Sequence, residues 1–92
     1  MSSQKAAPKK EVLVSEHIKG ENHLVLFNDD VNTFEFVIDS LVEVCEHERH
    51  QAEQCSLIVH YNGKCEVKKG DFGKLKPMQE ALVERGLTAA IE

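Results

Sequence analysis

The 92-residue chain has no tryptophan, one tyrosine, two prolines and three cysteines. The odd cysteine count, without a Cys-x-x-Cys pair, argues against a disulfide framework and favours a reducing, cytoplasmic environment. No apolar run approaches the roughly 20 residues that span a bilayer, and the first residues lack the apolar core of a signal peptide. We therefore expect no membrane association. The net charge of −5 argues against nucleic-acid binding, which needs a cationic surface.

The length and composition fit one small domain. The chain is too short for a multi-layered enzyme fold, and its 41% of apolar residues suffice for a single modest core. Residues 1–21 are polar with mixed charge, and we expect them to form a flexible N-terminal tail. Residues 22–92 are expected to form the core domain.

The first half of this domain predicts a strand, a turn and a helix. Leu24–Phe27 is a short β-prone run, and Asn28–Asp30 are poor strand formers that favour a turn. Asn32 can cap a helix, with Glu35 three residues on as in a capping box. One face of that helix carries apolar side chains at helical spacing. They are Phe34, Val37, Ile38, Leu41, Val44 and Cys45.

The second half predicts two more helices and two more strands. A helix is expected over residues 48–61, ended by Gly63. Its buried side is predicted to carry Ala52, Cys55, Ile58 and Val59. A short strand at residues 65–67, a third helix ending at Arg85–Gly86 and a closing strand at residues 87–91 follow.

The region before the third helix is constrained by lysines and a proline. Five lysines between residues 64 and 76 are interrupted by Gly70 and Gly73, which predicts a basic loop. A proline deep inside a helix costs about 3 kcal/mol, so the third helix is expected to begin near Pro77 or to follow a separate turn. The resulting order β-α-α-β-α-β predicts an α+β fold, with a small antiparallel sheet packed against three helices.

Asn28, Asp29 and Asp30 place three strong acceptor side chains between an apolar strand and a helix start. Composition alone favours a simple turn, because Asn and Asp dominate turns and acidic groups suit helix starts. The functional alternative is an acceptor cluster for a cation, either a metal ion or an ammonium group. His60, near the end of the second helix, is either a half-buried histidine or a member of the same polar site.

Metal-binding and hydrolytic functions have weaker signals. Two cysteines and two histidines invite a zinc interpretation, but their spacing fits no zinc-finger pattern, and the cysteines fall on apolar faces. They are Cys45, His47, His50 and Cys55. No Gly-x-Ser-x-Gly, P-loop or His-Glu-x-x-His motif occurs. A small metal-binding module or a hydrolase using Asp29, Asp30 and His60 remains the alternative to a binding protein.

Three segments carry a more specific pattern: Phe27–Asp30, Phe34–Asp39 and Val59–Lys64. Together they resemble the ClpS family, adaptor proteins of the N-degron pathway, over most of residues 22–92. The resemblance implies a small sheet packed on three helices. It also implies a monomeric adaptor with no cofactor and no catalytic activity. Such an adaptor binds substrates whose first residue is Leu, Phe, Tyr or Trp, and delivers them to the N-terminal domain of a Clp AAA+ unfoldase that feeds a peptidase.

The resemblance further implies site residues. Asn28, Asp29 and His60 match positions that bind the substrate's α-amino group. Asp30 matches a position that supports the turn. The remaining matches surround a hydrophobic pocket that reads the first side chain. They are Leu26, Phe34, Val37, Ser56 and Val59.

Two of the pocket positions depart from the family pattern. Phe34 and Ser56 stand where methionine is usual or frequent in the family. Phenylalanine is stiffer than methionine, and serine is smaller. If both side chains line the pocket, one change narrows it and the other widens it, so the preference among the four first residues stays open.

Overall fold

The computed structural model of the protein describes residues 21–92. Its elements follow the order β-α-α-β-α-β, as predicted. They are β1 (Asn22–Phe27), α2 (Phe34–Cys45), α3 (Arg49–Asn62), β2 (Lys64–Gly70), α4 (Phe72–Glu84) and β3 (Thr88–Ile91). The flexible tail predicted for residues 1–21 lies outside the described residues, apart from residue 21.

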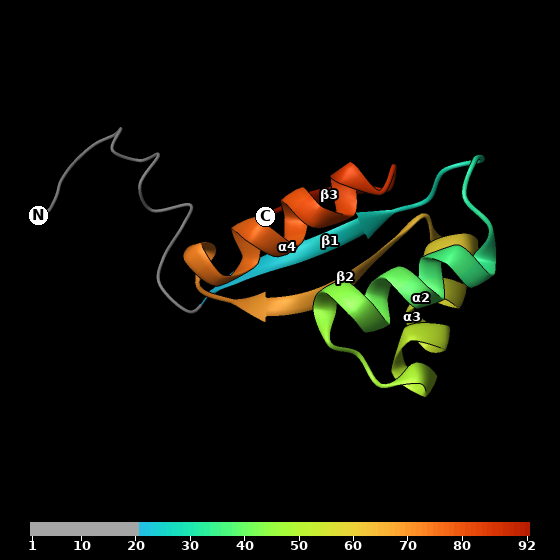
Figure 1. The fold of residues 1–92 in the computed structure, drawn as a ribbon, viewed down its shortest axis with the longest axis horizontal. Helices are drawn as coiled ribbons and strands as arrows, with labels where there is room; N and C mark the ends of the chain where they lie inside the picture. The colour runs from blue at the N-terminus through green and yellow to red at the C-terminus, as the bar shows by residue number, and fades with distance from the viewer. Residues whose placement is uncertain (1–20) are drawn as a thin grey trace, which may run out of the picture.

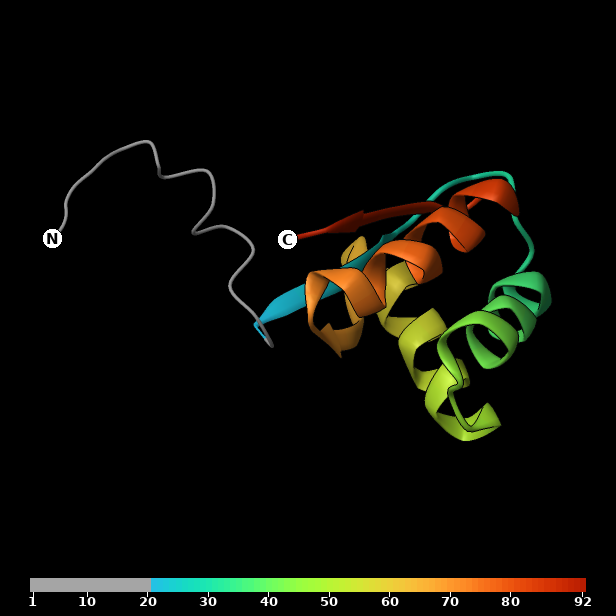
Figure 2. The same ribbon diagram turned by 60° about the vertical axis from the view of Figure 1, so that its left-hand side comes forward.

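The three strands form one antiparallel sheet in the order β2-β1-β3. Figures 1 and 2 show α4 lying along β1 and β3, and α2 and α3 on the side of β2. Because side chains of all three helices and all three strands meet in one buried cluster, the helices cover a single face of the sheet. The predicted α+β fold is therefore confirmed.

The core is built mainly from aliphatic side chains at the predicted spacing, with exceptions on α3 and on α2, where Phe34 of the predicted apolar face is 43% exposed. Its twelve members are Leu24, Leu26, Ile38, Leu41, Cys45, Ala52, Val59, Val67, Leu75, Leu82, Leu87 and Ala89. Helix α3 turns Ala52, Ser56 and Val59 inward, at positions i, i+4 and i+7. Ile58 lies off this stripe and is 41% exposed, so its predicted place on the buried side is wrong.

Helix α2 is capped by Thr33. The sequence analysis predicted Asn32 as the cap, and that prediction is wrong. The Thr33 backbone is extended, and its Oγ1 accepts a hydrogen bond from the Phe36 N–H at 3.1 Å. The Asn32 side chain instead donates hydrogen bonds to other parts of the chain. Thr33 is also a suitable capping residue, one position further on. Because the Asn32 side chain is engaged with Asp29 and Gly86, Thr33 caps the helix.

The strand predicted at residues 65–67 is confirmed but is longer, and the rest of the predicted basic loop enters helix α4. Strand β2 runs from Lys64 to Gly70 and pairs with β1 along its whole length, apart from a bulge opposite Leu24 and Val25. Strand β2 lies at the edge of the sheet. Lysines suit such an edge because their charge discourages pairing with another chain.

Pro77 lies inside α4 rather than near its start, contrary to the prediction. The helix already begins at Phe72, so the missing proline N–H would have faced the carbonyl of the exposed Gly73 in the first turn. Leu75, before the proline, is fully buried. Its burial stabilises this turn by about 1.5–3 kcal/mol, which offsets much of the cost of the proline.

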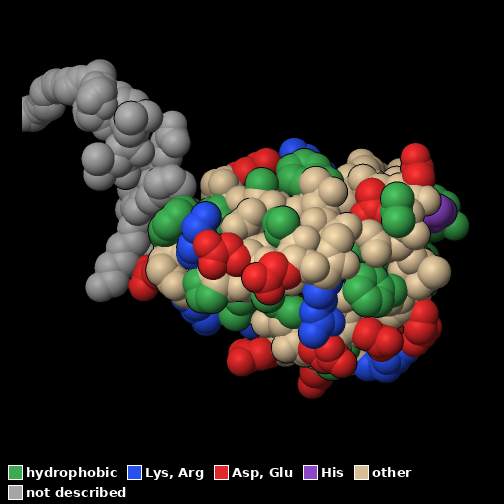
Figure 3. Space-filling view, turned by 45° about the horizontal axis from the view of Figure 1, so that its top comes forward, with side chains coloured by type: hydrophobic (Ala, Val, Ile, Leu, Met, Phe, Trp, Pro, Cys, Tyr) green, Lys and Arg blue, Asp and Glu red, His purple; other side chains and the backbone are tan. Residues whose placement is uncertain are grey.

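The surface mixes charged and apolar side chains. Figure 3 shows one face, on which the exposed apolar groups are separated by charged ones. The large apolar side chains with the most exposure are Val31, Phe34, Phe36, Leu57, Ile58, Tyr61 and Val83. None of the helices within residues 21–92 is long and apolar enough to cross a membrane.

Candidate functional site

The pairing of β1 with β2 brings residues 28–30, called the acceptor turn below, against the end of α3. The last residue of β1 pairs with the first residue of β2, and the Asn28 N–H donates to the Gly63 carbonyl at 2.9 Å. Gly63 ends α3 in the left-handed region with φ of 94°, a conformation that glycine adopts without strain. His60 lies in the last turn of α3, immediately before this junction. The fold thus places residues 28–30 beside an imidazole 30 positions further along the chain.

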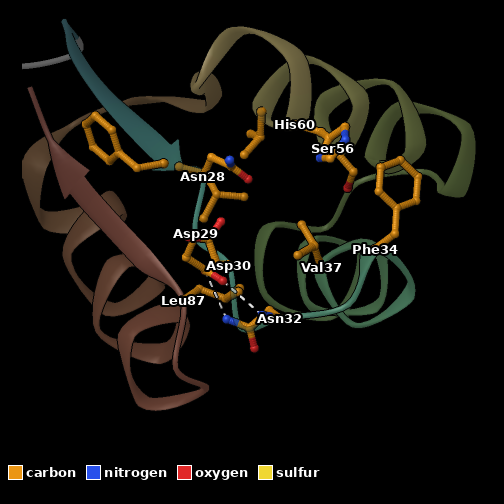
Figure 4. A pocket seen from close by; sticks show the side chains of 12 residues that line it. Asn28, Asp29, Asp30, Asn32, Phe34, Val37, Ser56, His60 and Leu87 are labelled. Carbon is orange, nitrogen blue, oxygen red and sulfur yellow. Dashed lines mark hydrogen bonds between the residues drawn. The ribbon is translucent and has the colours of Figure 1, made fainter.

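A hollow of about 330 Å³ lies between this turn and helices α2 and α3 (Figure 4). All the residues that the sequence analysis assigned to the site line it. They are Leu26, Asn28, Asp29, Asp30, Phe34, Val37, Ser56, Val59 and His60. Figure 4 shows Asn28 and Asp29 facing Phe34 and Ser56 across the hollow. Three lining residues were missed: Phe27, Asn32 and Leu87.

The carboxylate of Asp29 holds the turn together. Its Oδ1 accepts hydrogen bonds from the backbone N–H groups of Val31 at 2.8 Å and Asn32 at 2.9 Å. Its Oδ2 accepts one from Asn32 Nδ2 at 3.0 Å. Partial burial raises the pKa of Asp29, but the hydrogen bonds from Asn32 and Val31 outweigh it and hold the pKa below its ordinary value. Asp29 is therefore ionised at neutral pH, and Oδ2 keeps lone-pair capacity for a further donor.

Asp30 does not make the turn contacts that the sequence analysis assigned to it. It is exposed, and the hydrogen bonds that close the loop all go to the half-buried Asp29. The two aspartates are adjacent, and an Asx turn from Asp29 reaches the backbone two and three residues on. The residue that supports the turn is therefore Asp29 and not Asp30.

Asn32 connects the acceptor turn to the segment before β3, which is distant in the sequence. Its Nδ2 donates both to Asp29 and to the Gly86 carbonyl at 2.9 Å. The next residue, Leu87, is 4% exposed and lines the hollow. This contact joins residues 54 positions apart, so no local sequence signal marks Asn32 or Leu87 as site residues.

The His60 ring stands at the mouth of the hollow between two aromatic rings. It is exposed and meets Phe34 edge to face, with ring centroids 6.5 Å apart, and Tyr61 with centroids 4.8 Å apart. Neither ring nitrogen makes a hydrogen bond within residues 21–92. The imidazole is thus held by ring packing and keeps its polar atoms available to a ligand.

The remaining wall of the hollow is apolar. Leu26 and Val59 are buried at 1% and 5% exposure, and Val37 is half-buried. Phe34 is 43% exposed and closes one side. The hollow therefore combines acceptor groups at one side with aliphatic and aromatic surface at the other. Such a site suits a ligand with a cationic donor group next to an apolar group.

The cysteines and histidines of the zinc hypothesis are not brought together. Within residues 21–92 no group of three or more His, Cys, Asp or Glu is placed to hold a metal ion. His47 is buried with its Nε2 2.6 Å from the Val67 carbonyl oxygen. Burial raises the pKa of Cys45 to about 11 and, together with the neighbouring Cys65 thiol, that of Cys55 to about 12. Both thiols are therefore protonated at neutral pH, with Cys45 buried and Cys55 half-buried.

Comparison with known proteins connects this geometry to one family. The family model described as ATP-dependent Clp protease adaptor protein ClpS matches residues 19–90. The ATP-dependent Clp protease adapter protein ClpS of Pectobacterium carotovorum is 39% identical over 59 residues, which are 62% of this chain and 56% of that protein. The ClpS protein of Neisseria meningitidis is 38% identical over 65 residues, 68% of this chain and 61% of that protein. The chain thus spans less than two thirds of the length of either relative.

A solved structure is similar in fold. It is Agrobacterium tumefaciens ClpS2 bound to L-phenylalaninamide, with a TM-score of 0.67 and 22% sequence identity. The similarity covers 80% of this chain and 98% of that one. Nearly the whole of that protein therefore shares the arrangement of strands and helices described above.

Proposed function

The chain belongs to the ClpS family, and from this premise we propose that it binds proteins that begin with Leu, Phe, Tyr or Trp and delivers them to a Clp AAA+ unfoldase that feeds a peptidase. The observation that carries the proposal is the hollow lined by an amide and a carboxylate from the turn, by an imidazole from the end of α3, and by apolar side chains. An adaptor of this kind transfers no chemical group, and we expect no turnover by the chain itself.

The polar side of the hollow is suited to a protein's free amino terminus. An ammonium group has three donors, whereas a residue inside a chain offers one backbone N–H. Asn28 and Asp29 on the turn and His60 at the end of α3 provide three acceptor side chains that line the hollow. Hydrogen bonds to charged groups contribute about 1.5–3 kcal/mol each, so an internal residue would lose several such contributions. The site therefore selects chain ends.

The apolar side of the hollow then selects the first side chain. Burying a Leu or Phe side chain is worth about 1.5–3 kcal/mol, which corresponds to roughly 10- to 150-fold in affinity. A small first residue gains little, and a charged one must be desolvated without a partner. The ClpS2 ligand L-phenylalaninamide has a free α-amino group and a benzyl side chain, and we assign this chain a ligand of the same kind.

A peptide series that varies only the first residue tests this function. Fluorescence anisotropy should detect binding of peptides beginning with Leu, Phe, Tyr or Trp, and much weaker binding of peptides beginning with Ala or Glu. N-acetylation of the same peptides removes the ammonium charge and should abolish binding. Acetylated peptides that bind as tightly as free ones would show that the polar groups do not capture an amino terminus.

Delivery requires a second assay with the unfoldase present. A fluorescent protein with Phe as its first residue should be degraded faster by a Clp unfoldase and its peptidase when the chain is added. We expect the unfoldase N-terminal domain to carry the contact, with one adaptor monomer acting alone. An unfoldase lacking that domain is the matched control. If the chain still accelerates degradation by this truncated unfoldase, the assignment of the contact is wrong.

A further inference from the structure

Ser56 places a polar atom in the apolar wall of the hollow. The residue is 2% exposed and lines the cavity from α3, one helical turn before His60. Its Oγ is buried and has no hydrogen-bond partner within residues 21–92. Figure 4 shows Ser56 beside His60 and near Phe34, and the apolar side chains of Val37 and Val59 line the same hollow.

A hydroxyl in this state is unusual on a helix. A serine inside a helix can donate to the carbonyl oxygen four residues earlier, which for Ser56 is that of Ala52, but it makes no such bond here. Leaving a buried polar group unpaired costs about 1–3 kcal/mol. Alanine would fill the same space without that cost. A ligand that offers a polar group at this point would remove the penalty.

We propose that Ser56 is a specificity-determining residue whose hydroxyl bonds the phenol of an N-terminal tyrosine, so that the chain prefers Tyr to Phe as first residue. This inference rests on the proposed function, because it takes the ligand's amino group to lie at Asn28, Asp29 and His60. Four residues of α-helix rise about 6 Å, so Ser56 lies about that far from His60 along α3. This distance is comparable with the length of a tyrosine side chain. The phenol oxygen of a first-residue Tyr then reaches the level of Ser56.

Phe34 controls access to the hydroxyl. Figure 4 shows Ser56 between His60 and Phe34, on the side of the hollow opposite Asn28 and Asp29. The Phe34 ring is 43% exposed, so it turns towards solvent without losing a fully buried contact. An aromatic first residue takes its place against Ser56. Leucine has no polar group for the hydroxyl and leaves it unpaired.

Three peptides with the same remaining sequence test the inference. They begin with Tyr, with Phe and with 4-methylphenylalanine, which has nearly the size of Tyr but no hydroxyl. One added hydrogen bond predicts that Tyr binds about two- to tenfold more tightly than either of the others. Ser56→Ala should bind all three peptides with equal affinity, because only the Tyr peptide loses a bond. Ser56→Cys keeps the side-chain size with a weaker donor and should reduce the Tyr preference.

The outcomes separate this inference from the proposed function. Equal binding of the three peptides to the natural chain overturns the inference, whatever the variants do. A Tyr preference that persists in folded Ser56→Ala, or that is undiminished in folded Ser56→Cys, also overturns it, because another group must then contact the phenol. In both cases the proposed function stands, since aromatic first residues still bind. If none of the three binds with a free amino terminus, the proposed function fails and the inference fails with it.

Discussion

We assign two roles to Asp29, and two substitutions separate them. Its carboxylate closes the turn through Val31 and Asn32, and it is assigned a hydrogen bond to the ligand's ammonium group. Asp29→Ala would remove both roles at once. Asp29→Asn removes the charge but keeps an oxygen that accepts from the backbone N–H groups of the turn. Asn32→Ala keeps the charge but removes the side-chain bonds to Asp29 and to Gly86.

The expected sizes follow from the lost interactions. A charge-assisted hydrogen bond to an ammonium group contributes about 1.5–3 kcal/mol, so Asp29→Asn should weaken binding of a Phe-initiated peptide about 10- to 150-fold. Asn32→Ala loses two partly exposed hydrogen bonds within the fold, which should lower the free energy of unfolding by about 1–3 kcal/mol. Its effect on affinity should be smaller, because Asp29 keeps its two backbone bonds.

Anisotropy with the same labelled peptide gives both affinities, and urea unfolding followed by circular dichroism gives both stabilities. A direct contact between Asp29 and the ligand predicts that Asp29→Asn weakens binding at least several-fold more than Asn32→Ala does. If the two variants weaken binding equally, Asp29 acts only by shaping the turn. If Asp29→Asn binds like the natural chain, Asp29 makes no charged contact with the ligand.

Two further predictions concern titration. The pKa of folded Asp29 is lowered, so its ionised form contributes stability above the unfolded pKa of about 3.9 and loses it as the pH falls through the folded value. The difference in the free energy of unfolding between the natural chain and Asp29→Asn should therefore shrink from pH 7 to about pH 3. An unchanged difference would argue against a lowered pKa of Asp29. Cys45 and Cys55, with pKa values of about 11 and 12, should react slowly with Ellman's reagent at pH 8 in a folded Cys65→Ser variant and quickly in urea. Fast reaction of both in the folded state would contradict the raised pKa values.

Local patterns in the sequence account for most of the secondary structure. The periodic apolar residues of α2 and the glycine after α3 act within a few positions, so their elements follow from the sequence directly. The misplaced features depend on distant partners. Strand β2 extends beyond the predicted residues 65–67 because β1 pairs with it, and α4 tolerates Pro77 because the buried Leu75 anchors its first turn.

The candidate site divides in the same way. Sequence alone singled out residues 28–30, His60 and five further positions that line the hollow, because most of them lie in short segments that resemble one family. Only the tertiary structure decided that Asp29 rather than Asp30 holds the turn, that Leu87 joins the wall, and that the Ser56 hydroxyl is buried without a partner. Those facts depend on which atoms meet across the fold. Periodicity and composition describe neighbours along the chain, and they carry no information about such meetings.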